Sequence, residues 1–251
     1  MLNSFDDYMD GKECGILFNE VYIKRRFRTP STDAMLKGQR FEYLAIGTKP
    51  GGEIPGEILT NTGNISKAEE SRVKTHADLF NESIKFHGID IKMTDVKEEI
   101  EFQDYILVYI MDYFGTWRDG NPLIGDLKYS GLLYNKWEDM GWEREKLRFN
   151  RKQRTQPLMY CYGYKWLHGE LPDFLYHVHS STNDIDFELY WMMITDSNLQ
   201  EFEERIYQFL EAIEFSKSYG FNPLPSRRKC KDCPVIDCKY RMKIPDITLI
   251  P

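Results

Sequence analysis

The sequence predicts an α/β fold with a mixed central β-sheet flanked by helices. Two runs rich in Tyr, Ile, Val and Phe, at 105–114 and 122–129, enclose an Asp-Gly pair, which is a strong hairpin signal. Further strands are expected at 89–104, 174–180 and 185–195. Helical patterns at 31–46, 66–88 and 199–219 end at glycines, which commonly close helices. The 251 residues allow one large domain, or a core with appendages.

The other segments follow in order along the chain. Residues 4–27 predict a short polar helix, a turn at Gly11 and an aromatic-apolar segment. The Gly- and Pro-rich stretch 48–64 predicts a loop. Helices are expected at 132–140 and at 155–169, the second starting near Pro157 because proline is tolerated in a first turn. Beyond Asn222 little could form a core, so something else must order that segment.

The charge balance is unusual for a nucleic-acid-binding protein. The net charge is −7, whereas affinity for nucleic acid comes largely from phosphate contacts. Basic clusters at 24–28, 144–154 and 227–229 soften this objection, although each one alone is more often a solvated surface. The densest, 144–154, contains Arg148, Arg151 and Lys152 and would suit a nucleic-acid backbone beside a metal centre. With no long apolar stretch and no visible signal peptide, we expect a cytoplasmic protein with no membrane contact.

Three charged residues interrupt the apolar hairpin. Asp126 and Lys128 share a strand face because side chains alternate. A loop of odd length centred on Gly120 would set Asp112 opposite Lys128, with Asp126 as its diagonal neighbour. An even-length loop would place Asp112 on the other face. Two carboxylates and a lysine on such a hairpin fit a divalent-cation site, and the alternative is an exposed cross-strand ion pair.

The cysteines indicate a metal centre. Five cysteines without an export signal favour metal or redox use over disulfides. The spacing Cys230-x2-Cys233-x4-Cys238 is a good ligand signal; the best fourth ligand is Cys14, with Cys161 as the spare. Four thiolates suit either zinc or an iron–sulfur cluster.

The histidines give a weaker signal. His177-x-His179 would place two imidazoles on one strand face, a zinc half-site without a third ligand nearby in the sequence. His76 and His87 are read as structural residues.

Taken in order, these motifs resemble the PD-(D/E)XK nuclease superfamily. Asp112 with Asp126-x-Lys128 is similar to its core, and Gly38-Gln39-Arg40-Phe41-Glu42 resembles its first motif. Gln156-x3-Tyr160 matches the motif of the RecB-like branch. The cysteines resemble the clasp of its iron–sulfur members, which include CRISPR-adaptation and helicase-associated nucleases, although those members usually have one more residue between the last two cysteines. The resemblance runs from about Ser4 to Tyr240.

The resemblance implies a fold, an activity and a set of site residues. The fold would be a restriction-endonuclease-like core: 1–251 form a single nuclease domain, on which 1–30 and 222–251 pack as a clasp joined by the metal cluster. The activity would be Mg²⁺- or Mn²⁺-dependent hydrolysis of DNA, most simply as an exonuclease on single strands or duplex ends. The metal ligands would be Glu42, Asp112, Asp126 and the Leu127 carbonyl, with Lys128 assisting. Gln156 and Tyr160 would support the site and contact DNA. Arg148, Arg151 and Lys152 of the basic run are further candidates for DNA contacts.

The cofactors and partners follow from the same resemblance. Cys14, Cys230, Cys233 and Cys238 would hold a [4Fe–4S] cluster, with zinc as the alternative. The setting would be the cytoplasm of a bacterium, an archaeon or a phage-infected host cell, with protein partners in recombination, replication or CRISPR adaptation. Two rivals remain: a DNA-binding module with an inactive nuclease site and a structural four-cysteine centre, and a zinc or redox protein unrelated to nucleases.

Overall fold

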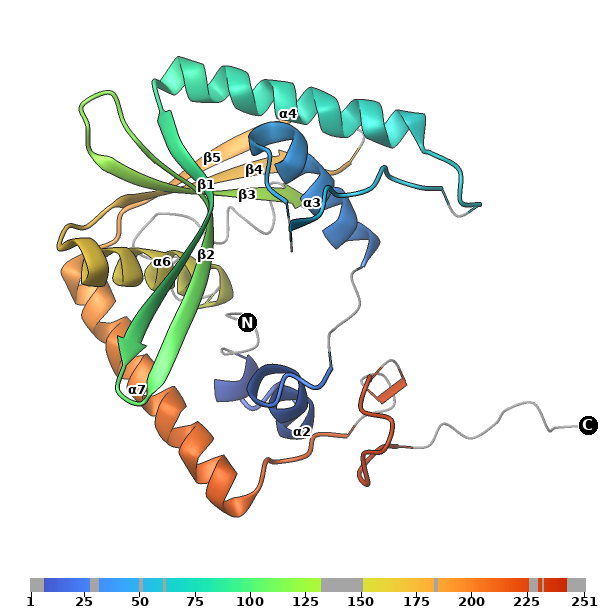
Figure 1. Cartoon of the computed structure of the whole chain (residues 1–251), viewed down its shortest axis with the longest axis vertical. Coiled ribbons are helices and arrows are strands. Elements are labelled where there is room, and N and C mark those ends of the chain that lie inside the picture. Colours follow the sequence, from blue (N-terminus) through green and yellow to red (C-terminus); the bar gives the residue numbers. More distant parts are fainter. Residues whose placement is uncertain are drawn as a thin grey trace, which may run out of the picture. The chain divides into compact units, whose positions relative to one another are not determined.

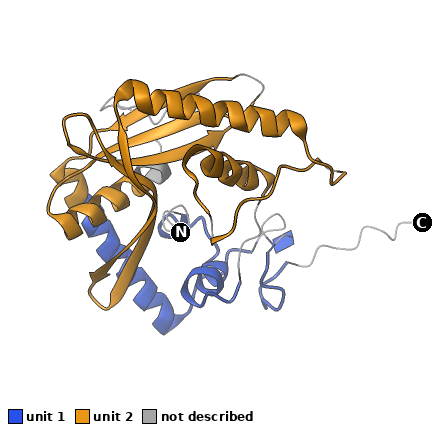
Figure 2. Cartoon of the chain, turned by 45° about the horizontal axis from the view of Figure 1, so that its top comes forward, with its two compact units in different colours: residues 1–30, 201–251 blue, residues 31–200 orange. Residues whose placement is uncertain are grey.

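A computed structural model describes most of the chain. The described residues are 7–27, 32–49, 52–60, 62–131, 151–182, 185–225, 230–231 and 233–242, with only the backbone for 151–154. They belong to two compact units, one formed by 31–200 and the other by 1–30 with 201–251 (Figure 2). Among the described helices, none has the length and apolar character needed to cross a membrane.

The larger unit contains a five-stranded mixed sheet in the order β1-β2-β3-β4-β5 (Figure 1). The strands are β1 (Asp90–Phe102), β2 (Tyr105–Thr116), β3 (Pro122–Ser130), β4 (Asp173–Ser180) and β5 (Phe187–Met192). Neighbouring strands are antiparallel except β3 and β4, which are parallel. Parallel neighbours need a crossover connection, and the helix α6 (Arg151–His168) lies within it. The expected α/β class is confirmed.

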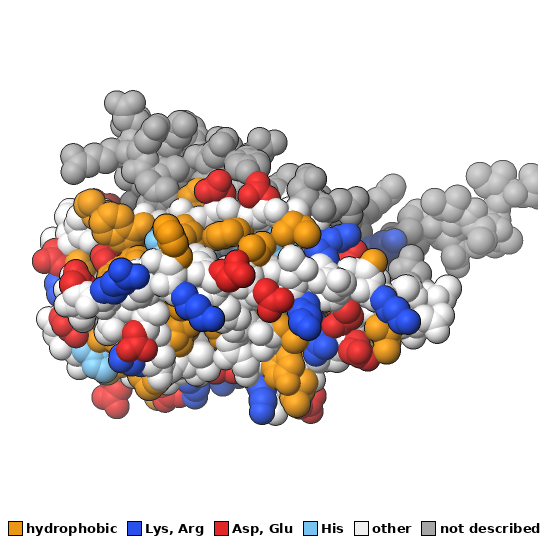
Figure 3. All heavy atoms as spheres, turned by 90° about the horizontal axis from the view of Figure 1, so that it is seen from above, with side chains coloured by type: hydrophobic (Ala, Val, Ile, Leu, Met, Phe, Trp, Pro, Cys, Tyr) orange, Lys and Arg blue, Asp and Glu red, His pale blue; other side chains and the backbone are white. Residues whose placement is uncertain are grey.

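Two helices pack on one face of the sheet. The helix α3 (Asp33–Ile46) begins at Thr32, whose hydroxyl accepts from the Met35 amide at 3.3 Å, and ends at Gly47 with φ +77°. The helix α4 (Lys67–His87) buries positions at helical spacing, including Val73, Ala77 and Phe80. These pack with Phe41 in a core that also contains buried residues of the sheet. Seen from the side of α4, the surface of the molecule carries side chains of both charges (Figure 3).

The helix α6 packs against the other face. It begins several residues before the expected start, so Pro157 lies inside the helix and not in its first turn. Stacked ring pairs join it to β2: Tyr109 with Tyr160 at 5.7 Å, and Phe114 with Tyr164 at 5.1 Å between centroids. This packing brings the middle of α6 to the strands that carry the charged residues.

The β2–β3 hairpin has a register different from the expected one. Tyr113 pairs with Gly125 and Thr116 with Pro122, so the loop of residues 117–121 is centred on Asp119 and not on Gly120. The loop is odd in length, as expected, and Asp112 therefore shares a face with Asp126. Continuing the same register sets Asp112 opposite Asp126, and the expected pairing with Lys128 is wrong by two residues. This shift brings the two carboxylates closer together.

Gly125 is required because the Tyr113 ring occupies the place of a side chain. An added Cβ would overlap Cζ of that ring, and the ring is fully buried with its hydroxyl 2.8 Å from Nε2 of His177. We expect Gly125→Ala to destabilise the protein by about 1–3 kcal/mol or more. Gly38→Ala is the control, because a Cβ there meets nothing within 4 Å and alanine favours a helix. Urea denaturation measures both; equal stability of the two variants would contradict this account.

The smaller unit is built from both ends of the chain. The short helix α2 (Gly15–Phe18) runs into a π-helical turn (Asn19–Ile23), and the long helix α7 (Asp196–Tyr219) contributes its residues from Glu201 onward. The Gly15 amide donates to the Asn222 carbonyl at 2.8 Å. A Cβ on Gly15 would lie 2.7 Å from that oxygen, so only glycine permits this approach of the two segments.

Candidate active site

The centre of the site is the fully buried carboxylate of Asp126 on β3. The Lys128 ammonium, two residues along the same strand, forms an ion pair with its Oδ2. Nε2 of Gln156 on α6 donates to its Oδ1. The Lys128 side chain keeps 30% of its surface exposed, whereas that of Asp126 keeps 1%. The lysine therefore lies between the buried acid and solvent.

Asp112 brings a second carboxylate from β2. Its Oδ2 accepts a hydrogen bond from the Leu127 amide at 2.6 Å, which fixes it beside β3 just beyond the last paired residues of the hairpin. Burial first, and then the charges of Asp126 and Glu42, raise the pKa of Asp112 well above its usual value. Burial also raises the pKa of Asp126, against the lowering effect of Lys128.

Glu42 supplies a third carboxyl from α3. Burial and then the charge of Asp126 raise its pKa to about 7. Its neighbour Phe41 is fully buried in the core, so the helix presents Glu42 from an anchored position. Burial by itself would lower the pKa of Lys128, but the surrounding carboxylates, Asp126 first, outweigh it and raise that pKa. Three carboxyls from three elements thus surround one ammonium.

The donor chemistry of this group fits a hard divalent cation, since carboxylate oxygens are the ligands that Mg²⁺ and Mn²⁺ take. Asp126 and Asp112 already use oxygens in the contacts with Lys128, Gln156 and the Leu127 amide. Within the described part of the chain, no three His, Cys, Asp or Glu side chains stand in an arrangement that would hold a metal ion without adjustment. Binding a cation here therefore requires these side chains to exchange partners.

Gln156 and Tyr160 lie one helical turn apart on α6 and form one unit. Nε2 of Gln156 also donates to Oη of Tyr160 at 2.8 Å. The Tyr160 ring is only 6% exposed, and burial followed by the charge of Asp126 raises its pKa well above 10. In this structure Gln156 contacts Asp126 directly, and Tyr160 contacts Gln156. The basic run is not described in this detail: Arg148 lies outside the described residues, and so do the side chains of Arg151 and Lys152.

Tyr176 on β4 is a site neighbour that the sequence reasoning missed. It pairs directly with Asp126 across the parallel β3–β4 ladder, and its ring lies under the Lys128 ammonium at 5.6 Å. No motif marks this tyrosine, because its relation to Lys128 depends on the register between strands joined by a long crossover. The strand 174–180 was expected, but its order in the sheet was not readable.

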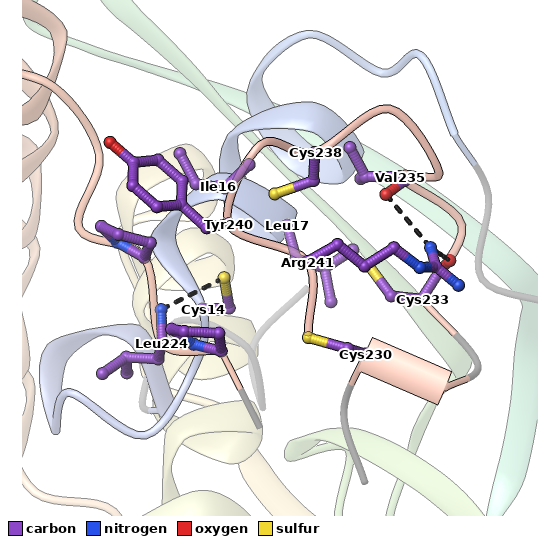
Figure 4. A pocket seen from close by; sticks show the side chains of 12 residues that line it. Cys14, Ile16, Leu17, Leu224, Cys230, Cys233, Val235, Cys238, Tyr240 and Arg241 are labelled. Atoms are coloured by element: carbon purple, nitrogen blue, oxygen red, sulfur yellow. Dashed lines mark hydrogen bonds between the residues drawn. The ribbon is translucent and has the colours of Figure 1, made fainter. Parts of the chain in front are cut away.

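All four expected cysteines lie in the smaller unit. Cys14, Cys230, Cys233 and Cys238 line one pocket (Figure 4). The Leu224 amide donates to Sγ of Cys14 at 3.5 Å, and Nη1 of Arg241 donates to the carbonyls of Cys233 and Val235 at 2.9 and 3.2 Å. The spare, Cys161, is instead fully buried in the larger unit, where burial raises the pKa of its thiol.

Three buried histidines lie on the α4 side of the sheet, away from the carboxylates. His177 and His179 share a face of β4, as expected, and His76 of α4 joins them with its Nδ1 3.2 Å from Nδ1 of His179. Burial lowers the pKa of His177 to about 3 and that of His179 to about 2, and it also lowers that of His76. His76 thus contacts His179 in space, but among the described residues the three histidines are not arranged to hold a metal ion.

These pKa values predict an effect on stability at low pH. Below about pH 6.5 these histidines become protonated in the unfolded chain but stay neutral in the folded protein. The free energy of unfolding therefore decreases as the pH falls below 6.5, whereas above pH 6.5 the histidines do not reduce it. The raised pKa of Glu42 acts in the opposite direction, so a variant must isolate the histidine effect. Going from pH 7.5 to 5.5, His177→Gln should gain about 1.4 kcal/mol relative to the unmodified protein in urea denaturation. His87→Gln, at an exposed position, is the control. If the stability difference between His177→Gln and the unmodified protein is the same at both pH values, His177 takes up its proton in the folded protein as well.

The fold has a counterpart among solved structures. The chain matches the crystal structure of a protein from Eubacterium rectale described as a "Putative exonuclease", with 17% identity and a TM-score of 0.60 over 88% of this chain and 82% of that chain. A second match, SSO0001, has 12% identity and a TM-score of 0.32 over 91% and 96%, too low to bear on the fold. No protein-family model and no curated protein matches the sequence. At 17% identity the first match supports the fold alone.

Proposed function

We propose that this protein is a metal-dependent nuclease that hydrolyses phosphodiester bonds of DNA. The observation that carries the proposal is the group formed by the buried Asp126 and three half-buried residues, Glu42, Asp112 and Lys128. All three carboxyls have a raised pKa there, so the site holds more acid groups than its one ammonium compensates. Such an excess is costly unless a cation completes it.

The cation would be Mg²⁺ or Mn²⁺, held by Glu42, Asp112, Asp126 and the Leu127 carbonyl. When bound, it supplies an activated water and stabilises negative charge on the phosphate. Lys128 is then the partly exposed cation beside the acids, and it is placed to stabilise the charge that develops on phosphorus oxygens. Gln156, held by Tyr160, keeps the Asp126 carboxylate oriented. The burial of Tyr160 favours this supporting role over a contact with DNA.

The substrate we propose is DNA, as single strands or duplex ends, attacked as by an exonuclease. The exonuclease description of the Eubacterium rectale protein agrees with this mode, although it is said of that protein. We further propose that the four cysteines hold a [4Fe–4S] cluster, with a zinc ion as the alternative. Their convergence on one pocket and the amide directed at Cys14 Sγ support a thiolate-bound centre.

The test is a cleavage assay with linear and closed circular DNA, in Mg²⁺ and in Mn²⁺, beside Lys128→Ala. We expect the linear substrate to be degraded and the circle to be spared, with cleavage strongly reduced in the variant. Cleavage of the closed circle, which has no end, would show that the protein is an endonuclease and not an exonuclease. Binding of DNA without cleavage in either metal would instead identify an inactive DNA-binding module with a structural four-cysteine centre.

The basic run predicts how binding depends on salt. Replacing Arg148, Arg151 and Lys152 with Gln should weaken DNA binding and reduce its salt slope by up to about one unit for each lost phosphate contact. The matched control replaces three exposed lysines of α4, Lys67, Lys74 and Lys85, which removes the same charge elsewhere. Fluorescence anisotropy at several salt concentrations measures both. Equal slopes for the two triple variants would assign the run to ordinary surface.

A further inference from the structure

Tyr176 lies beside Asp126 and Lys128 but belongs to none of the sequence motifs. It stands opposite Asp126 in the parallel register of β3 and β4, so its side chain projects from the same face as Asp126 and Lys128. The ring is 1% exposed, although the Lys128 side chain that lies over it is 30% exposed. A rigid buried ring therefore supports a flexible and partly solvated lysine.

The Tyr176 ring and the Asp126 carboxylate both contact the Lys128 ammonium and restrict its position. Nζ of Lys128 lies 5.6 Å from the centroid of Tyr176, within the range of a cation–π interaction, and it also contacts the Asp126 carboxylate. A lysine side chain has four rotatable bonds, and fixing all of them removes much rotamer freedom. A ring that cannot move reduces that cost at the moment when the ammonium must face a phosphate.

The ring is itself held in place. Phe174 packs edge-to-face against Tyr176 at 4.9 Å, and Tyr160 of α6 lies 6.1 Å from Phe174. This aromatic row connects the Gln156–Tyr160 pair to the support of the lysine. We propose that Tyr176 is a positioning residue that orients the Lys128 ammonium toward the substrate phosphate through the face of its ring. The kinetic part of this inference rests on the proposed nuclease function.

The proposal makes the aromatic ring, and not the hydroxyl, the required feature. Tyr176→Phe should retain kcat within about 3-fold, whereas Tyr176→Leu should lower kcat about 10- to 30-fold with KM for DNA unchanged. In a Lys128→Ala background, Tyr176→Leu should cause no further loss. The control is Phe80→Leu, which removes a fully buried ring on the α4 side of the sheet and leaves the row of Tyr160, Phe174 and Tyr176 intact; it should leave kcat close to normal once the folded fraction is measured.

A spectroscopic measurement tests the placement without relying on activity. Protons above an aromatic face are shifted upfield, so the Cε protons of Lys128, assigned by their loss in Lys128→Arg, should be upfield in the unmodified protein and in Tyr176→Phe. They should return to the ordinary lysine position in Tyr176→Leu. Unshifted Lys128 protons in the unmodified protein would overturn the proposal, and so would equal losses of kcat in the Phe and Leu variants. If no variant cleaves DNA, the proposed function fails and the shift alone decides the position of Lys128.

Discussion

Asp126→Asn and Asp112→Asn should each reduce DNA cleavage by about 10³-fold or more. A divalent cation contributes several kcal/mol of transition-state stabilisation, and each 1.36 kcal/mol corresponds to a factor of about ten in rate. Either substitution removes a charged ligand from the proposed cation site. Asparagine keeps the shape of the side chain, and at position 112 its carbonyl oxygen can still accept from the Leu127 amide.

Asp112→Asn should not weaken the metal-free fold. Burial and the charges of Asp126 and Glu42 raise the pKa of Asp112, which means that its charged form is disfavoured where it lies. A neutral amide at this position relieves that repulsion, so urea denaturation in EDTA should show stability equal to or greater than that of the unmodified protein. Asp126→Asn also removes the ion-pair partner of Lys128 and should therefore be less stable than Asp112→Asn. Asp119→Asn, in the exposed hairpin turn, is the control for both measurements. An Asp112→Asn protein that cleaves at the normal rate in Mg²⁺ would remove Asp112 from the proposed site.

The second large effect concerns the cysteines. Cys14→Ser should lose the bound metal and loosen the smaller unit, because the binding free energy of a structural metal centre is also folding free energy. Protein purified without oxygen should be brown and contain about four irons per chain, as expected for one [4Fe–4S] cluster bound by four cysteines. Limited proteolysis should then cut Cys14→Ser near residues 222–240. Cys161→Ala, a change of the buried thiol in the larger unit, should keep the full metal content.

Gly15→Ala provides an independent test that leaves all the thiols in place. The new Cβ would lie 2.7 Å from the Asn222 carbonyl oxygen and 2.9 Å from the amide nitrogen of the same residue, so the two segments must separate. We expect partial loss of metal and the same new proteolytic sites. A colourless protein with one zinc would defeat the iron–sulfur proposal and leave the clasp intact. A Cys14→Ser protein with full metal content would defeat the clasp itself.

The sequence was sufficient for features encoded over short distances. The Asp-Gly turn, the glycines at the ends of α3 and α4 and the alternation along β3 each depend on a few neighbouring residues, and the corresponding elements are present. The register of the hairpin required one further fact, the centre of the loop. The Trp117 amide donates to the Asn121 carbonyl at 3.0 Å, which closes a five-residue loop around Asp119. Because the loop is centred on Asp119 and not on Gly120, each residue of β2 faces a β3 residue two positions earlier than expected.

Features that depend on strand order and helix packing could not be read in advance. The approach of Tyr176 to Lys128 requires that β4 lies beside β3 in parallel, and the approach of His76 to His179 requires that α4 covers that part of the sheet. Each of these residues is an ordinary core side chain by its local pattern. Burial then changes their chemistry, since the same imidazole that titrates near neutrality in water stays uncharged in the core.

The smaller unit, made of the two ends of the chain, has a consequence for the order of events during synthesis. Residues 31–200 are complete before the segment that holds Asn222 and the last three cysteines has been translated. At about 5–20 residues per second, Cys14 waits roughly 10–45 seconds for Cys230 to be added. During that time its thiol has no partner on the far segment and is open to oxidation or to a wrong metal. A nascent chain stalled before residue 222 should therefore contain a folded sheet and a Cys14 thiol without its partners, so that the proposed metal centre would be assembled only after Cys238 has been added.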